Sequence, residues 1–107
     1  MAGAPISILA SQVNGLVRQV HGRACHILGG QLAKTGVGDG YVVFFDATTA
    51  NVTLGTTVPT YFQVVSATDQ DPIRGTPIAF NTALSIAAVT TPTGATGTDI
   101  HVNMVIG

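Results

Sequence analysis

The sequence predicts an all-β fold, specifically an antiparallel β-sandwich or jelly-roll-like domain with an N-terminal arm. Short runs of aromatic and β-branched residues recur every eight to fifteen residues and are separated by turn-forming residues, which is typical of a sandwich. The most apolar run, GYVVFFDA at residues 40–47, lies between closely spaced glycines and a Thr-rich segment. Its residue types suit a pleated strand with neighbours on both faces. We therefore expect residues 40–47 to form a strand in the middle of a sheet.

The length and composition predict one domain that associates with other subunits. A chain of 107 residues has room for one core and no second domain, and we divide it into an arm at 1–13 and a domain at 14–107. Only 8% of the residues are charged and 46% are apolar, which excludes intrinsic disorder. A surface with a net charge of −1 and so few charged groups favours association. We expect a homo-oligomer, in particular a trimer.

Charge and targeting features exclude two further classes of partner. A protein that binds the phosphate backbone of nucleic acids needs clustered basic residues, whereas the basic residues here are scattered: Arg18, Arg23, Lys34 and Arg74. No apolar run approaches the length of a membrane-spanning helix. Residues 1–13, MAGAPISILASQV, lack the basic start of a secretory signal. We therefore expect no nucleic acid and no membrane as partner, and a chain that is made and kept soluble.

Residues 1–12 have the weak alternation of a β-strand. Because Pro5 cannot donate a hydrogen bond to a ladder, we expect this segment at a sheet edge or reaching across to a neighbouring subunit. An arm that adds a strand binds through main-chain hydrogen bonds. We expect Ile6, Ile8 and Leu9 to anchor such an arm at an interface.

Residues 13–24 leave a helix and a strand open as alternatives. Their apolar residues have helical spacing. Gly15 and Gly22 oppose a helix, because each costs about 1 kcal/mol relative to alanine in a helix interior. We favour two strands, at residues 16–21 and 23–32, with a bend at Gly22.

Clear strand patterns continue through the second half of the chain. They cover residues 60–66 (TYFQVVS), 84–90 (LSIAAVT) and 100–106 (IHVNMVI), with a shorter strand at 77–80. In the last strand, we expect four alternate residues to share one face, with His101, Asn103 and Val105 on the other. The four are Ile100, Val102, Met104 and Ile106.

The segments between these strands are expected to be turns and loops. We interpret residues 47–59 as a long excursion between the two sheets, residues 67–76 as a polar loop and residues 91–99 as a loop rich in Gly and Thr. The segment KTGVGDG at residues 34–40 superficially resembles a phosphate-binding loop. Such a loop opens a helix and ends in GK[ST], whereas this one enters the strand at 40–47, so we interpret it as a turn.

Carboxylates that could catalyse hydrolysis or bind a cation are scarce. The chain has no glutamate, and each of its five aspartates lies in a predicted turn or at a strand end. Asp69 and Asp71 are the only close pair. The other ligands of a dedicated calcium loop are missing around them, so we favour turn capping over a weak calcium site.

The candidate zinc ligands are His21, His26, His101 and Cys25. Residues at adjacent or odd spacing in a strand point to opposite faces, so a local site would need an unusual bend. We expect partly exposed histidines, a buried Cys25, no metal and no other cofactor. The serines lie in no nucleophile-elbow context. The sequence therefore predicts no catalytic residue and no enzyme activity.

Two segments of the chain resemble a type of small bacteriophage virion protein. The first, GYVVFFDATTANVTLGTTVPTYFQVV, has a strand ending in Phe45-Asp46-Ala47 and a GTT-x-P turn from Gly55 to Pro59. The second, GTPIAFNTALSIAAVTTPTGATG, places Gly75, Ile78 and Phe80 before the LSIA strand at 84–87. The resemblance covers about residues 16–107. It implies a structural component of phage particles, such as a capsid decoration or cement protein or a small tail or fibre module, and brings no catalytic residues.

We therefore expect a non-enzymatic phage virion structural protein, in particular a decoration or cement protein that bridges and stabilises capsid subunits. Its partners would be the major capsid protein or other virion subunits, and its location the capsid surface. The alternative is a tail or fibre module that binds a host receptor or a carbohydrate. In that case the loops at 69–74 and 91–99 would form the interface, with Asp71 and Arg74 in contact with the ligand. Aromatic residues could add a sugar-stacking platform, but in a small sandwich they more often belong to the core.

Overall fold

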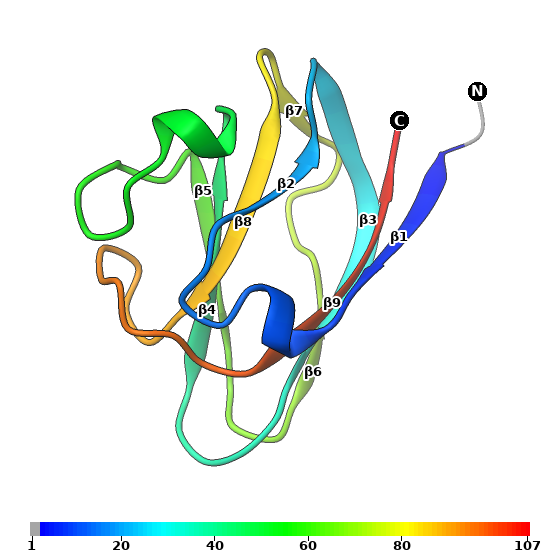
Figure 1. Ribbon diagram of the computed structural model, residues 1–107. Coiled ribbons are helices and arrows are strands. Elements are labelled where there is room, and N and C mark those ends of the chain that lie inside the picture. Colours follow the sequence, from blue (N-terminus) through cyan, green and yellow to red (C-terminus); the bar gives the residue numbers. More distant parts are fainter. Residues whose placement is uncertain (1–2) are drawn as a thin grey trace.

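The computed structural model describes residues 3–107 as two antiparallel β-sheets packed face to face (Figure 1). Sheet A contains, in spatial order, β1 (Ala4–Ile8), β9 (Ile100–Ile106) and β3 (Cys25–Lys34), followed by β6 (Gln70–Pro72) and β7 (Ile78–Phe80), which both pair with β3. Sheet B contains, in order, β2 (Arg18–His21), β8 (Leu84–Val89), β4 (Gly40–Phe45) and β5 (Tyr61–Val65). Two 3-10 turns complete the elements: η1 (Ala10–Gln12) and η2 (Thr49–Asn51). The predicted all-β sandwich is confirmed.

The main core lies between the two sheets and is built by strand alternation. The four residues of β9 that we expected to share one face are all buried. On β3, Ile27 and Leu32 face the same core and are fully buried. Since β9 lies between β1 and β3, it holds sheet A together.

β4 lies in the middle of sheet B, between β8 and β5, as the GYVVFFDA pattern predicts. Val42 and Phe44 face the main core. Val43 and Phe45 face the other side of the sheet and belong to a second buried cluster. This strand therefore has no polar face, because both of its sides are covered.

Residues 47–59 connect β4 to β5, which are neighbours in the same sheet. The prediction that this segment passes from one sheet to the other is therefore wrong. The segment covers the outer face of sheet B, where Val52 joins the second cluster and Leu54 packs against it (Figure 1). The physical reason is the apolar outer face of β4 and β8, which must be shielded from water.

Residues 13–24 form no α-helix, so the favoured strand interpretation is confirmed, with β2 ending before Gly22. Gly15 adopts a left-handed φ of 64° and donates its N–H to the carbonyl of Ala88 at 3.0 Å. The N–H of Ala88 donates in turn to the carbonyl of Val13 at 2.8 Å. Glycine is the residue that reaches this φ at no steric cost, so Gly15 lets the chain turn beside β8 before β2 begins.

The polar segment at 67–76, which we expected to be a loop, contains the short strand β6. Its residues pair with Gln31, Leu32 and Ala33 of β3. The buried side chain of Gln63 on β5 holds the next part of the segment by accepting the N–H of Arg74 at 2.9 Å and donating to the carbonyl of Pro72 at 2.7 Å. This strand is thus held by main-chain pairing and by one side chain of the opposite sheet. Neither interaction leaves an apolar pattern in the sequence.

Two adjacent glycines of β3 have different surroundings and provide a matched test of the packing of sheet A. A Cβ at Gly30 would lie 2.1 Å from the carbonyl oxygen of Asn103 and 2.7 Å from Cα of Met104, both main-chain atoms of β9. A Cβ at Gly29 would meet no atom within 4 Å. We expect Gly30→Ala to lower the free energy of unfolding by about 3 kcal/mol and Gly29→Ala to change it by less than about 1 kcal/mol. Urea unfolding measures both; equal effects would contradict the close contact of β3 and β9 at Gly30.

Candidate functional site

The residues predicted to anchor an N-terminal arm lie on or beside β1. This strand pairs along its whole length with β9 of the same chain, from Ala4 with Ile106 to Ile8 with Val102. Ile8, which we expected to contact a neighbouring subunit, is only 3% exposed and packs in the core of its own chain, because its position in the register faces inward. Ile6 packs against that core, and Leu9 is 62% exposed. Leu9 is therefore the member of this group that is open to a partner.

Asp71 and Arg74, predicted for the alternative receptor site, form an ion pair of 3.6 Å between Oδ1 and Nη2. The carbonyl of Arg74 accepts the hydroxyl of Tyr61 at 2.9 Å, which ties this segment to β5. The loops at 69–74 and 91–99 both reach the end of the sandwich near Lys34 and Thr35. The N–H groups of these two residues donate to the carbonyls of Asp69 and Asp99, each at 3.0 Å.

The aromatic residues do not form one stacking platform. Phe44 and Phe80 are buried in the main core, and Phe44 packs against Tyr61 at a centroid distance of 5.4 Å. Phe62 is 50% exposed on the outer face of sheet B, where its ring meets Tyr41 edge to face at 6.1 Å. The prediction of a core role is confirmed for Phe44 and Phe80, and Phe62 instead forms part of an exposed apolar patch.

The candidate zinc ligands do not gather into one site. Cys25 is buried, as predicted, while His26 is exposed and His21 is half-buried. His101 accepts the N–H of Ala10 through Nδ1 at 3.0 Å. Within residues 3–107, no three His, Cys, Asp or Glu side chains gather closely enough to hold a metal ion.

The KTGVGDG segment forms the turn between β3 and β4. Gly36 and Gly38 adopt left-handed φ values of 77° and 81°, and β4 follows directly. Lys34 is buried, and its ammonium donates to the carbonyl of Thr35. A phosphate-binding lysine must reach the ligand, so this arrangement agrees with the turn interpretation.

Asp46 at the end of β4 caps the turn between β7 and β8. Its carboxylate accepts the N–H groups of Asn81 at 3.0 Å, Thr82 at 2.7 Å and Ala83 at 3.3 Å. Partial burial opposes the charged form, but these three hydrogen bonds outweigh it and lower the pKa of Asp46 below its ordinary value of 3.8. Asp46 thus has the turn-capping role that we predicted for Asp69 and Asp71.

Asp46→Asn removes the charge while keeping the shape of the cap. We expect it to lower the free energy of unfolding by about 1–2 kcal/mol near neutral pH. Because the folded pKa is lowered, the contribution of Asp46 is fully present above 3.8 and is lost as the pH falls through the folded value. The difference in the free energy of unfolding between wild type and variant should therefore decrease below about pH 4. Urea unfolding across pH checks this. The control is Asp39→Asn, which removes the charge of a carboxylate that accepts a single N–H, that of Ala67.

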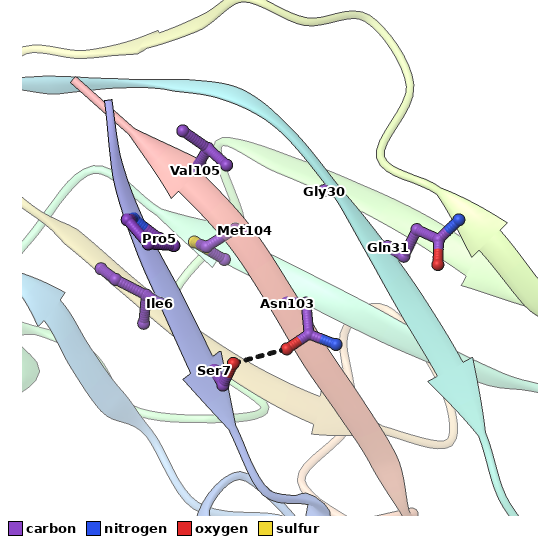
Figure 2. A pocket seen from close by; sticks show the side chains of 8 residues that line it. All are labelled: Pro5, Ile6, Ser7, Gly30, Gln31, Asn103, Met104 and Val105. Carbon is purple, nitrogen blue, oxygen red and sulfur yellow. Dashed lines mark hydrogen bonds between the residues drawn. The ribbon is translucent and has the colours of Figure 1, made fainter. Parts of the chain in front are cut away.

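A shallow trough of about 380 Å³ crosses the outer face of sheet A (Figure 2). Pro5 and Ser7 of β1, Asn103 and Val105 of β9 and Gln31 of β3 line it. The hydroxyl of Ser7 donates to Oδ1 of Asn103 at 2.7 Å, so the Asn103 NH₂ group stays free to bind a ligand. The exposed amide of Gln31 is free as well. The side chains in this row are uncharged, and those of Ser7, Gln31 and Asn103 carry hydrogen-bonding groups.

A second cavity of about 420 Å³ lies where the edge strands β1 and β2 face each other across the sandwich. Ile6, Val20 and Ile106 give it apolar walls, and His21 and Cys25 also line it. Burial, and secondarily the negative charge of Asp46, raises the pKa of the Cys25 thiol above 9.0. A thiol of this kind is a poor nucleophile at neutral pH, because the thiolate is the reactive form.

We therefore expect Cys25 to react slowly with a thiol reagent in the folded protein. Its rate at pH 7 should be well below that of the urea-unfolded chain and should still increase above pH 9, since the raised pKa delays formation of the thiolate. Stopped-flow labelling of both states gives the two pH profiles. Rapid labelling at pH 7 in the folded state would show an activated thiol instead.

Comparison with known proteins gives one distant likeness. No family model and no curated protein sequence matches the chain. The chain is similar in structure to a chain solved under the description "Bacillus endospore appendages form a novel family of disulfide-linked pili", with 15% identity, a TM-score of 0.48, and coverage of 97% of this chain and 81% of that chain. At this identity and score the likeness carries no argument about function. Residues 3–107 include no helix long and apolar enough to span a membrane.

Proposed function

We propose that this chain is a non-enzymatic structural subunit of a phage particle, a decoration or cement protein that attaches to the capsid and stabilises it. The observation that carries the proposal is the outer face of sheet A, which has no Asp, Glu, Lys or Arg at its outward positions. Within residues 3–107 these positions hold Pro5, Ser7, His26, Leu28, Gly29, Gln31, Ala33, Gln70, Pro72, Ala79, His101, Asn103 and Val105. The proposal also draws on the resemblance of residues 16–107 to small virion proteins.

A sheet face without charged side chains is suited to docking on another protein. Burying a charged group without a partner is costly, whereas amides, hydroxyls and apolar groups can pair or be buried at little cost. Interface cores are depleted in charged residues for this reason. Leu9, which directly follows β1, adds an exposed apolar side chain. A subunit that binds the assembled shell and not its dissociated parts stabilises the shell by mass action.

Purified particles test the proposal directly. We expect a mass-spectrometric census to find the chain at hundreds of copies per virion, and particles that lack it to lose heat resistance while still adsorbing to cells. A handful of copies per particle would indicate a tail or fibre location. Absence from particles, or turnover of a substrate by the free chain, would contradict the proposal.

A single charge tests whether the outer face of sheet A is the docking surface. We expect Gln31→Lys to reduce binding to particles that lack the protein by at least tenfold, because the lysine would be buried without a partner. Val37→Lys is the matched control, since Val37 is 95% exposed in the turn between β3 and β4. Equal binding of both variants in a particle pull-down would place the docking surface elsewhere.

The trough of Figure 2 supports a second candidate function, a tail or fibre module that binds a carbohydrate. The side chains of Ser7, Gln31 and Asn103 offer the donors and acceptors that sugar hydroxyls pair with. Binding on a glycan array that is lost in Gln31→Ala and Asn103→Ala would favour this function. Loss in variants of Asp71 and Arg74 would place the ligand on the loop at 69–74 instead.

A further inference from the structure

We propose that copies of this chain join head to tail through the free edges of sheet B, with β2 of one copy beside β5 of the next. The inference deepens the proposed structural role, since it names the surface through which subunits meet. Within residues 3–107, β2 pairs only with β8 and β5 only with β4. Both strands therefore present unpaired main-chain groups at the two sides of sheet B.

The two sheets differ in how their edges are protected. One edge strand of sheet A, β1, carries Pro5. The other edge is shared by β6, which carries Pro72, and by the three-residue strand β7, which Pro77 directly precedes. A proline removes a main-chain donor and is a common way to keep an edge from pairing. The edge strands of sheet B, RQVH and YFQVV, contain none. Sheet B is thus the sheet that is open to extension.

The strand directions favour a second copy as the partner. In sheet B, β2, β8, β4 and β5 alternate in direction, because each neighbouring pair is antiparallel. β2 and β5 therefore run in opposite directions. A copy displaced sideways without being turned end for end brings its β2 antiparallel to β5 of the first copy. The two strands also match in length, with four and five residues.

The charged residues near the ends of β2 and β5 favour the same antiparallel arrangement of the two strands. The first 38 residues contain three basic residues and no acidic one, whereas all five aspartates lie from Asp39 onward. Exposed Arg18 begins β2. Exposed Asp39 and Asp69 lie at the end of β5, where Asp39 accepts the N–H of Ala67 at 3.0 Å. In an antiparallel pair of β5 with β2, the end of the first strand meets the start of the second, so Arg18 meets these carboxylates.

The apolar patch on β5 supplies the remaining contact. Phe62 and Val64 are 50% and 38% exposed on the outer face of sheet B, beside Tyr41. A fifth strand on this edge would cover them, since side chains of neighbouring strands pack against each other on the same face. A symmetrical contact between two β2 edges is disfavoured, because it brings Arg18 and Arg23 of both copies together.

Sedimentation velocity over a range of concentrations tests the inference on the full chain. We expect reversible association of wild type that is abolished by Val64→Lys, which places a charge on the β5 edge. Arg18→Glu and Asp69→Arg should each weaken association roughly five- to tenfold. The double variant R18E/D69R should restore it, because the charges are exchanged. Gln31→Lys, on the outer face of sheet A, is the control and should associate like wild type. Circular dichroism confirms folding of each variant.

Several results would overturn the inference. A wild type that stays monomeric, or a Val64→Lys variant that still associates, would show that the β5 edge is not used. Association that is insensitive to Arg18→Glu but lost in Val64→Lys would indicate a symmetrical β5 contact instead of a head-to-tail one. A monomeric chain that still binds particles would overturn this inference and leave the proposed function intact. Association without particle binding would overturn the proposed function and leave this inference intact.

Discussion

The packing of this protein depends on two strands that are apolar on both faces. Val43 and Phe45 of β4 and Ala87 and Val89 of β8 point away from the main core, yet they are as buried as the residues that face it. Residues 47–59 make this burial possible by folding back over sheet B. Ser85 is the polar exception on β8. Its hydroxyl donates to the carbonyl of Ala47 at 2.8 Å, so a hydrogen bond also joins residues 47–59 to sheet B. The sandwich is effectively three layers deep on this side.

The few charged side chains mostly serve the structure within the chain. Asp46 caps one turn and Asp39 holds another, Lys34 is buried against a carbonyl, and Asp71 pairs with Arg74. The outer face of sheet A is consequently neutral over most of its area. Polar recognition on such a surface depends on amides and hydroxyls, which favour shape-matched contact over long-range steering.

Periodicity predicted those parts of the fold that rest on side-chain burial. The alternation in β9 and the continuous apolar run of β4 each identified a strand and its buried residues, because burial leaves a pattern in the sequence. β6 escaped prediction, since main-chain pairing with β3 and the Gln63 side chain fix it. The inward position of Ile8 depends on its register with Val102, which no local pattern reveals. For the same reason the sequence suggested Leu9 and the Asp71–Arg74 loop as contact residues but gave no sign of the trough or of the open edges of sheet B.

The position of β9 between β1 and β3 has a consequence for synthesis in the cell. β1 is made before the other strands of the domain, and its partner residues, from Val102 to Ile106, belong to the last strand. Until that last strand has left the ribosome, β1 and β3 have no shared neighbour, and the halves of sheet A stay separate while sheet B already has all its members. Completion of sheet A therefore waits until β9 has been made, and nascent chains cannot close the domain before then.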